Sequence, residues 1–525
     1  MVELVVRATW VLVLLGLMNH ALVEPAAGQA SSLSQHGLSV AFSEEHGFGQ
    51  YANGDYWIVG PVELVQVSPG WDGLRHGAMV SPEAAGAHGY HAQVFGYDAA
   101  LNVATQLPRS LAPGDSLIVS HGWLADDEGA PSVPATMAPA PRPSLRDAAV
   151  FTIVDAPPPP GAFRPPYTNV ALDTFTVDQL NWHRLTNMPA LDSAPAWATH
   201  EQRTERVWID HKPYWSGRYI QPSNNMVAYG REIAQHFNEA TLKLLMDHPQ
   251  HEKQQTLINL VQIGIDFYGN ILSAHASDWY TGSAHNAWTG DWGGAIGTGR
   301  KWPILFAGLM LGDQGMVDIV SQHRGDWQED SQTYYDDQGN VTWTDRNATR
   351  GFTDGFDNGY RLCCTANVWN GAALSALIMG ARDDWGHDPF FDYVDWHMNP
   401  DNEDKPEWQR GWTPFLREAW DTWRPLLDEL IAGDMNRDGV VDTADVAPFV
   451  LGLTDREAYV DQYGIDPVLV GDINGDGVFD TADVAAFVQL LVGDGSGSAA
   501  VPEPGSIALL GLGALALLRR WRAAP

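Results

Sequence analysis

The chain has 525 residues and a formal net charge of -35, with 45% hydrophobic and 18% charged residues. This length predicts about two to four domains, because a single core rarely serves so long a chain. The acidic excess excludes non-specific binding to nucleic acid, since a negative protein repels the phosphate backbone.

Residues 1–30 have the features of a signal peptide. Arg7 precedes an apolar run at residues 10–18, and small residues lead to a predicted cleavage point before Ser31. The apolar run is too short to span a bilayer. We therefore expect export across the inner membrane, followed by cleavage.

Residues 36–155 predict an all-β domain. Short alternating or apolar runs at residues 56–65, 91–97 and 149–154 are separated by clusters of Gly, Pro and Asp. This pattern favours a β-sandwich. Residues 156–167 contain four consecutive prolines and predict a stiff, extended linker.

Residues 168–430 change to a helical period and predict an α-helical, toroid-like (α/α) domain. Long connections rich in Gly and Trp, at residues 278–302 and 325–360, separate the helices, and such connections usually carry function. Four apolar stripes recur at every third or fourth residue. They are Ile233, Phe237, Ala240 and Leu244; Leu257, Leu260, Val261, Gly264 and Tyr268; Ile304, Gly308 and Leu311; and Leu374, Leu377, Ile378 and Ala381.

A helical toroid joined to a β-sandwich in an exported protein resembles the architecture of polysaccharide lyases and some glycosidases. The resemblance is one of architecture, without the catalytic signature of a named family. It implies an enzyme that degrades polysaccharide, either a lyase or an O-glycosyl hydrolase. The alternative is a non-catalytic surface protein that binds or organises exopolysaccharide and uses its C-terminal module for assembly.

A glycine-rich stretch, residues 277–301, gathers the candidate catalytic residues. A β-eliminating lyase needs a group that neutralises the uronate carboxylate, a base that removes the C5 proton and an acid for the leaving oxygen. Asn286 or Arg300 would neutralise the carboxylate. His285 would be the base and Tyr280 the acid.

A hydrolase would instead need two carboxylates, which Asp291 with Asp354 or Asp357 would supply. Substrate binding calls for aromatic faces that stack on sugar rings and polar groups that bond the hydroxyls. The candidates for this role are His211, Asn225, Trp288 and Trp292. The tryptophans near polar groups in the helical half are Trp279, Trp288, Trp292, Trp302, Trp327 and Trp343.

Cys363 and Cys364 are the only cysteines of the chain, and they are adjacent. A disulfide framework is therefore excluded. Because a bond between neighbouring cysteines is strained, we expect two free buried thiols.

An acidic segment, residues 433–450, recurs at residues 471–488 with 14 of 18 positions identical. Each copy places side-chain oxygens at loop positions 1, 3, 5, 9 and 12, a glycine at position 6 and a backbone carbonyl at position 7, which is the arrangement that Ca²⁺ prefers. The predicted ligands are Asp434, Asn436, Asp438, Val440, Asp442 and Asp445 in the first loop, and Asp472, Asn474, Asp476, Val478, Asp480 and Asp483 in the second. We therefore predict two Ca²⁺ sites.

Position 12 of each loop is Asp where an EF-hand has Glu, and a helix is expected after each loop but not before it. In these features residues 433–495 resemble a type I dockerin. The resemblance implies a small α module that binds a cohesin-bearing partner through loop positions 10 and 11, here Thr443-Ala444 and Thr481-Ala482. The expected shared core is Val446, Phe449, Val450, Val484, Phe487 and Val488.

Residues 501–525 combine a Pro-Glu-Pro box, an apolar stretch at residues 507–518 and a terminal arginine cluster. The arginines would hold the tail on the cytoplasmic side of a short transmembrane helix. This order resembles the PEP-CTERM sorting signal of Gram-negative bacteria. The resemblance implies processing by an exosortase-type enzyme and a final location in the cell envelope or outside the cell.

Overall fold

The computed structural model describes residues 28–82, 87–133, 139–168, 170–212, 215–227, 230–276, 298–322, 327–343, 359 and 361–493. The chain divides into two compact units, Met1–Glu429 and Leu430–Pro525. The first unit contains a β-rich region followed by helices, and the second is helical.

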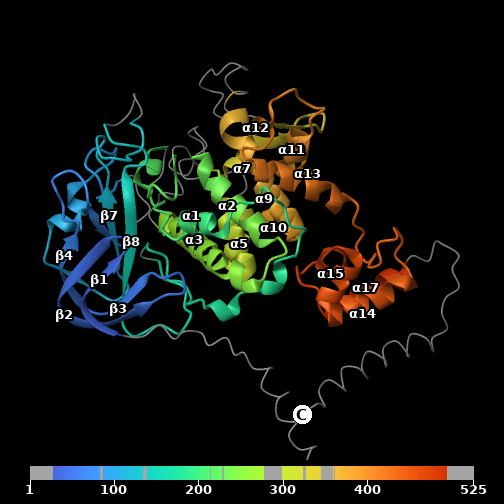
Figure 1. Cartoon of the computed structure of the whole chain (residues 1–525), viewed down its shortest axis with the longest axis horizontal. Coiled ribbons are helices and arrows are strands. Elements are labelled where there is room, and N and C mark those ends of the chain that lie inside the picture. Colours follow the sequence, from blue (N-terminus) through green and yellow to red (C-terminus); the bar gives the residue numbers. More distant parts are fainter. Residues whose placement is uncertain are drawn as a thin grey trace, which may run out of the picture. The chain divides into compact units, whose positions relative to one another are not determined.

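Eight strands of the first unit form one curled sheet, drawn in blue and cyan in Figure 1. The order is β5-β7-β8-β3-β2-β4-β6, and β1 also pairs with β2. Within this sheet β3 and β8 run parallel, and the other pairs are antiparallel. The strands are β1 (Gly28–Gln35), β2 (Leu38–Gln50), β3 (Tyr56–Val59), β4 (Val62–Ser68), β5 (Ala78–Val80), β6 (Arg109–Leu111), β7 (Ser116–Gly122) and β8 (Leu145–Val154).

The curl of the sheet depends on β2, which pairs with different strands in its two halves. Its residues 39–42 pair with β4, and its residues 48–50 pair with β3. The register shifts between Ala41 and Phe42, and such an irregularity bends a strand. The strands therefore enclose one apolar core as a continuous sheet, where the sequence predicted the two sheets of a β-sandwich.

Helices make up the rest of the first unit, together with a short hairpin of β9 (Thr333–Tyr335) and β10 (Val341–Trp343) and a π-helical turn, η7 (Arg361–Thr365). The helices are α1 (Trp197–Thr204), α2 (Arg231–Leu244), α3 (Gln250–Ala276), α5 (Lys301–Leu311), α6 (Gln314–Gln322), α7 (Gln328–Gln332), α9 (Ala366–Ile378), α10 (Arg382–Trp385), α11 (Asp388–Met398), α12 (Glu407–Arg410) and α13 (Pro414–Asp428).

The centre of the helical region is formed by α2, α3, α5 and α9: α3 packs against α5, and α2 packs against both α3 and α9. α5 is buried along its whole length and α9 along nearly all of it, as expected for helices that are apolar on every side. A Cβ at Gly264 of α3 would lie 2.4 Å from both the Pro303 carbonyl oxygen and the Ala307 Cβ of α5, so this close approach requires glycine. The four predicted stripes fall on α2, α3, α5 and α9, except that Ala381 follows the end of α9. The closed toroid stays a prediction.

A buried ion triad connects the sheet to α3. Arg164 donates from Nε to Asp55 Oδ2 at 2.7 Å, and from Nη1 and Nη2 to Asp266 at 3.0 and 2.6 Å. The three side chains are between 1% and 4% exposed. Burial opposes the charge of Arg164, but the carboxylates of Asp266 and Asp55 outweigh it and raise the pKa of Arg164.

The residues around Arg164, which the sequence predicts to be an extended linker, pack against the helices. Phe163 and Tyr167 are buried, and the Arg164 N–H donates to Gln262 of α3 at 2.8 Å. The segment 162–167 therefore packs into the first unit, with Pro165 alone of its residues exposed.

The second unit contains α14 (Val446–Thr454), α15 (Arg456–Tyr463), α16 (Val468–Gly471) and α17 (Asp483–Gly493). In Figure 1 they are drawn in red-orange, with α14, α15 and α17 labelled. α14 and α17 each begin at the end of one acidic loop, as the sequence predicted.

We expect Arg164→Leu to destabilise the first unit by about 3–5 kcal/mol, because it leaves two buried carboxylates without a cation. Arg146→Leu is the matched control: its side chain is 55% exposed and 3.8 Å from Asp147, so its loss should change stability by less than about 1 kcal/mol. Urea unfolding followed by tryptophan fluorescence measures both. Equal destabilisation by the two variants would contradict the role of the triad.

Candidate functional site

The first acidic loop is held by hydrogen bonds from its own backbone. Asp434 accepts from the N–H groups of Asp438 at 3.1 Å and Gly439 at 2.8 Å. Asn436 Oδ1 accepts from the same Asp438 N–H at 2.8 Å. Gly439 has a φ of 89°, so the turn predicted at loop position 6 has the left-handed backbone that favours glycine.

The second loop repeats these bonds. Asp472 accepts from the N–H groups of Asp476 at 3.1 Å and Gly477 at 2.8 Å, and Asn474 Oδ1 accepts from Asp476 at 2.8 Å. Gly477 has a φ of 79°. The sequence repeat is therefore also a repeat of structure.

The aspartates at position 12 are buried. Asp445 accepts from the N–H groups of Asn436 and Asp442, both at 2.9 Å. Asp483 makes the equivalent two bonds in the second loop, at 3.1 and 2.9 Å. Both side chains are 0% exposed, and within the described residues neither forms an ion pair with Lys or Arg. Each is a buried negative charge that backbone N–H groups stabilise.

Negative charges also crowd one another in the second loop. Burial, with a further contribution from the carboxylates of Asp483 and Asp476, raises the pKa of Asp472. Nowhere in the described part of the chain do three or more His, Cys, Asp or Glu side chains form a group that could hold a metal ion. In both loops the carboxylates instead accept backbone N–H bonds, and the two Ca²⁺ sites stay a prediction.

The core of the second unit is aromatic. Phe449 of α14 stacks on Phe487 of α17, with ring centroids 4.1 Å apart, and Phe479 meets Phe449 edge to face at 4.9 Å. Of the predicted core residues the two phenylalanines are buried and Val446 is half-buried, but Val450, Val484 and Val488 are 38% to 42% exposed. That part of the prediction is wrong, because α14 and α17 turn only their phenylalanine-bearing faces to the core.

Most candidate catalytic and substrate-binding residues of the body lie outside the described residues. They are Tyr280, His285, Asn286, Trp288, Asp291 and Trp292, and with them Asp354 and Asp357. Arg300 is described, and its Nε and Nη2 donate to Asp210, each at 2.8 Å, in an ion pair that is about 5% exposed.

Two further candidates, His211 and Asn225, are also buried. The His211 ring lies 5.9 Å from the rings of Tyr90 and Tyr167, and burial, ahead of its charged neighbours, lowers its pKa to about 3, so it is neutral at pH 7. Asn225 Nδ2 donates to the backbone carbonyl of Val207 at 2.9 Å. Trp302 and Trp327 are 1% exposed and belong to the hydrophobic core.

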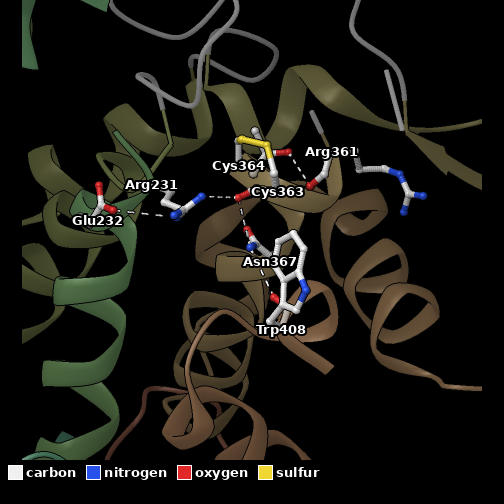
Figure 2. Close-up of a disulfide and its surroundings, with 8 residues drawn as sticks. Arg231, Glu232, Arg361, Cys363, Cys364, Asn367 and Trp408 are labelled. Atoms are coloured by element: carbon white, nitrogen blue, oxygen red, sulfur yellow. Dashed lines mark hydrogen bonds and ion pairs between the residues drawn. A yellow bond between two sulfur atoms is a disulfide. The ribbon is translucent and has the colours of Figure 1, made fainter. Parts of the chain in front are cut away.

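The two cysteines form a disulfide between adjacent residues in η7 (Figure 2), so the prediction of free thiols is wrong. The backbone carbonyl of Cys363 accepts from Arg231 Nη1 at 2.7 Å and from Asn367 Nδ2 at 3.2 Å. Arg231 also lies over the Trp412 ring, 3.4 Å from its centroid. These contacts hold η7, the turn that precedes α9, against α2.

A cavity of about 260 Å³ that the sequence did not predict lies between the sheet and the helices of the first unit. Side-chain amides are the most frequent group in its lining, at five of eleven residues, and we call it the amide cavity. Its strand wall includes Gln35, His36, Gln50 and Asn53, and its helix wall includes Glu201, Glu205, Gln255 and Asn259. Residues scattered over five elements leave no local pattern, so no motif in the sequence points to it.

Residues 500–523 match the family model described as the PEP-CTERM protein-sorting motif. The chain is an exported protein. The motif indicates sorting to the cell envelope or surface of a Gram-negative bacterium, and such signals are processed by exosortase-type enzymes. No curated protein and no solved structure matches the chain. Within the described residues we find no helix with the length and apolar character needed to cross a bilayer, and the predicted helix at residues 507–518 lies outside them.

We expect Phe449→Ala to destabilise the second unit by about 3–5 kcal/mol, because it removes the ring shared by both aromatic contacts. Hydrogen–deuterium exchange of peptides from α14 and α17 measures the loss of protection. Val492→Ala, at a side chain that is 63% exposed, is the control and should leave exchange unchanged. Unaltered protection in Phe449→Ala would show that the stacked rings do not hold the helices together.

Proposed function

We propose that this exported envelope protein binds two Ca²⁺ ions in its acidic loops and uses the resulting dockerin-like module to attach to a cohesin-bearing partner. The matched hydrogen-bond networks of the two loops carry the proposal. Both networks fix the loop backbone in the same turn and bring five oxygen-bearing side chains into one short segment.

The ligands would be Asp, Asn, Asp, a backbone carbonyl, Asp and Asp at positions 1, 3, 5, 7, 9 and 12 of each loop. Calcium would balance the buried charges of Asp445 and Asp483, which have no basic partner in the described residues. Binding would therefore stabilise the folded module. Thr443-Ala444 and Thr481-Ala482, the predicted partner-contacting positions, are exposed on the second unit.

The full-length exported protein should bind two Ca²⁺ ions, as measured by isothermal titration calorimetry after chelator treatment and dialysis. Asp445→Ala and Asp483→Ala should each lower the stoichiometry to one ion, because each removes the last ligand of one loop. Asp461→Asn makes a similar charge change at an exposed position outside the loops and should retain two. Absence of calcium binding, or loss of an ion in Asp461→Asn, would refute the assignment.

For the body, we propose the binding of polysaccharide without its cleavage, in preference to a lyase or a hydrolase. The observation that favours this function is the amide cavity, which offers hydrogen-bonding groups of the kind that bind sugar hydroxyls. Arg300, the one candidate catalytic residue within the described part of the chain, forms a buried ion pair with Asp210.

Incubation of the full-length protein with a broad panel of polysaccharides tests this preference. We expect neither the absorbance of unsaturated uronates, which a lyase would produce, nor new reducing ends, which a hydrolase would release. Either product, lost in a His285→Ala or Asp291→Asn variant, would establish an enzyme instead.

A further inference from the structure

We propose that the amide cavity binds one neutral sugar unit of a polysaccharide. The inference rests on the proposed polysaccharide-binding function of the body, and it adds a place and a ligand class. The cavity is formed where the β1–β2 and β2–β3 turns face α1 and α3.

The strand wall is rigid because hydrogen bonds within the protein hold its side-chain amides in place. Gln35 Nε2 donates to Asp55 Oδ1 at 3.0 Å, and Asn53 Nδ2 donates to Asp55 Oδ2 at 2.8 Å. Gln50 Nε2 donates to the Gly54 carbonyl at 2.9 Å. Asp55 is itself fixed by Arg164 at 2.7 Å. These side chains would reach a ligand with little loss of conformational freedom, which favours binding.

Two polar atoms of this wall are buried without a hydrogen-bond partner within the described residues, Gln35 Oε1 and His36 Nε2. Such groups are costly to leave unsatisfied. Burial, and next the charge of Arg206, lowers the pKa of His36, so its ring is neutral at pH 7 and presents one donor and one acceptor. A hydroxyl, which both donates and accepts, satisfies either atom.

The helix wall adds acceptors and a further amide pair. Gln255 Nε2 donates to Asn259 Oδ1 at 2.9 Å, which leaves the Gln255 carbonyl oxygen for a ligand. Glu201 and Glu205 stand one turn apart at the end of α1. Tyr56 contributes an aromatic ring at the strand side.

Charge and size restrict the ligand. No Lys or Arg is among the residues that line the cavity. Arg206 lies beside it and pairs with Glu205, but Glu201 has no ion pair within the described residues and would repel a uronate or a sulfated sugar. A volume of about 260 Å³ lies just below the roughly 300–1,000 Å³ of sites for drug-sized molecules and suits about one sugar ring. Many hydroxyls and no charge are the properties of a neutral hexose or pentose unit.

Isothermal titration calorimetry at pH 7 on the full-length exported protein tests the proposal. The probes are cello-, malto- and xylo-oligosaccharides as neutral ligands, oligogalacturonate as an anionic one and chitosan oligosaccharides as cationic ones. At least one neutral oligosaccharide should bind, and the charged probes should bind more weakly. Stronger binding of oligogalacturonate or chitosan oligosaccharides would overturn the ligand class.

The location is tested with Gln50→Leu and Gln255→Leu, which replace exposed amides by side chains of similar size. Each should weaken binding of the neutral oligosaccharide about three- to tenfold, the effect of one lost hydrogen bond. Gln254→Leu, an exposed neighbour on α3 outside the cavity, should bind as the unmodified protein does. Unchanged unfolding midpoints would confirm that the variants fold.

The outcomes separate the site from the function. Unchanged affinity in both cavity variants would overturn the site while leaving polysaccharide binding intact. Failure of every probe, neutral and charged, to bind the unmodified protein would overturn both the site and the proposed function of the body. Neither result bears on calcium, which is measured separately in the second unit.

Discussion

A buried cation, Arg164, joins the sheet of the first unit to its helices. Arg164 neutralises Asp55, which lies in the turn between β2 and β3, and Asp266, which lies in the middle of α3. It thereby fixes the sheet to the longest described helix, α3. The same Asp55 orients the Gln35 and Asn53 amides, so the geometry of the amide cavity follows from the ion triad behind it. An arrangement of this kind is costly to break, because no side chain of the triad is more than 4% exposed.

In the second unit, by contrast, no cationic side chain of the described residues pairs with the buried carboxylates of the acidic loops. Asp445 and Asp483 accept bonds from backbone N–H groups instead. In the first unit a protein cation completes the charge balance, whereas the second unit leaves that role to the proposed Ca²⁺ ions. The acidic composition of the chain thus contributes to two different kinds of site.

The sequence predicted what depends on local patterns. The helical stripes of α2, α3, α5 and α9 follow from a period of three to four residues, and the helices after the acidic loops follow from the repeat. The ion triad joins residues 109 and 102 positions apart, and the walls of the amide cavity come from five elements, so no local sequence pattern predicts either. The exposed Val450, Val484 and Val488 show a further limit: apolar spacing marks a helix face, but the packing partner decides which part of that face is covered.

The parallel pairing of β3 with β8 has a consequence for the order of folding. β3 ends at Val59 and β8 begins at Leu145, yet the two are direct neighbours in the sheet. β8 also pairs with β7 on its other side, so it connects the two halves of the sheet. A chain that enters the periplasm from its N-terminus therefore holds an incomplete sheet, with an open edge at β3, until residue 154 has followed. Contacts between such distant residues form late and slowly, which makes the partly translocated chain the form most exposed to misassembly.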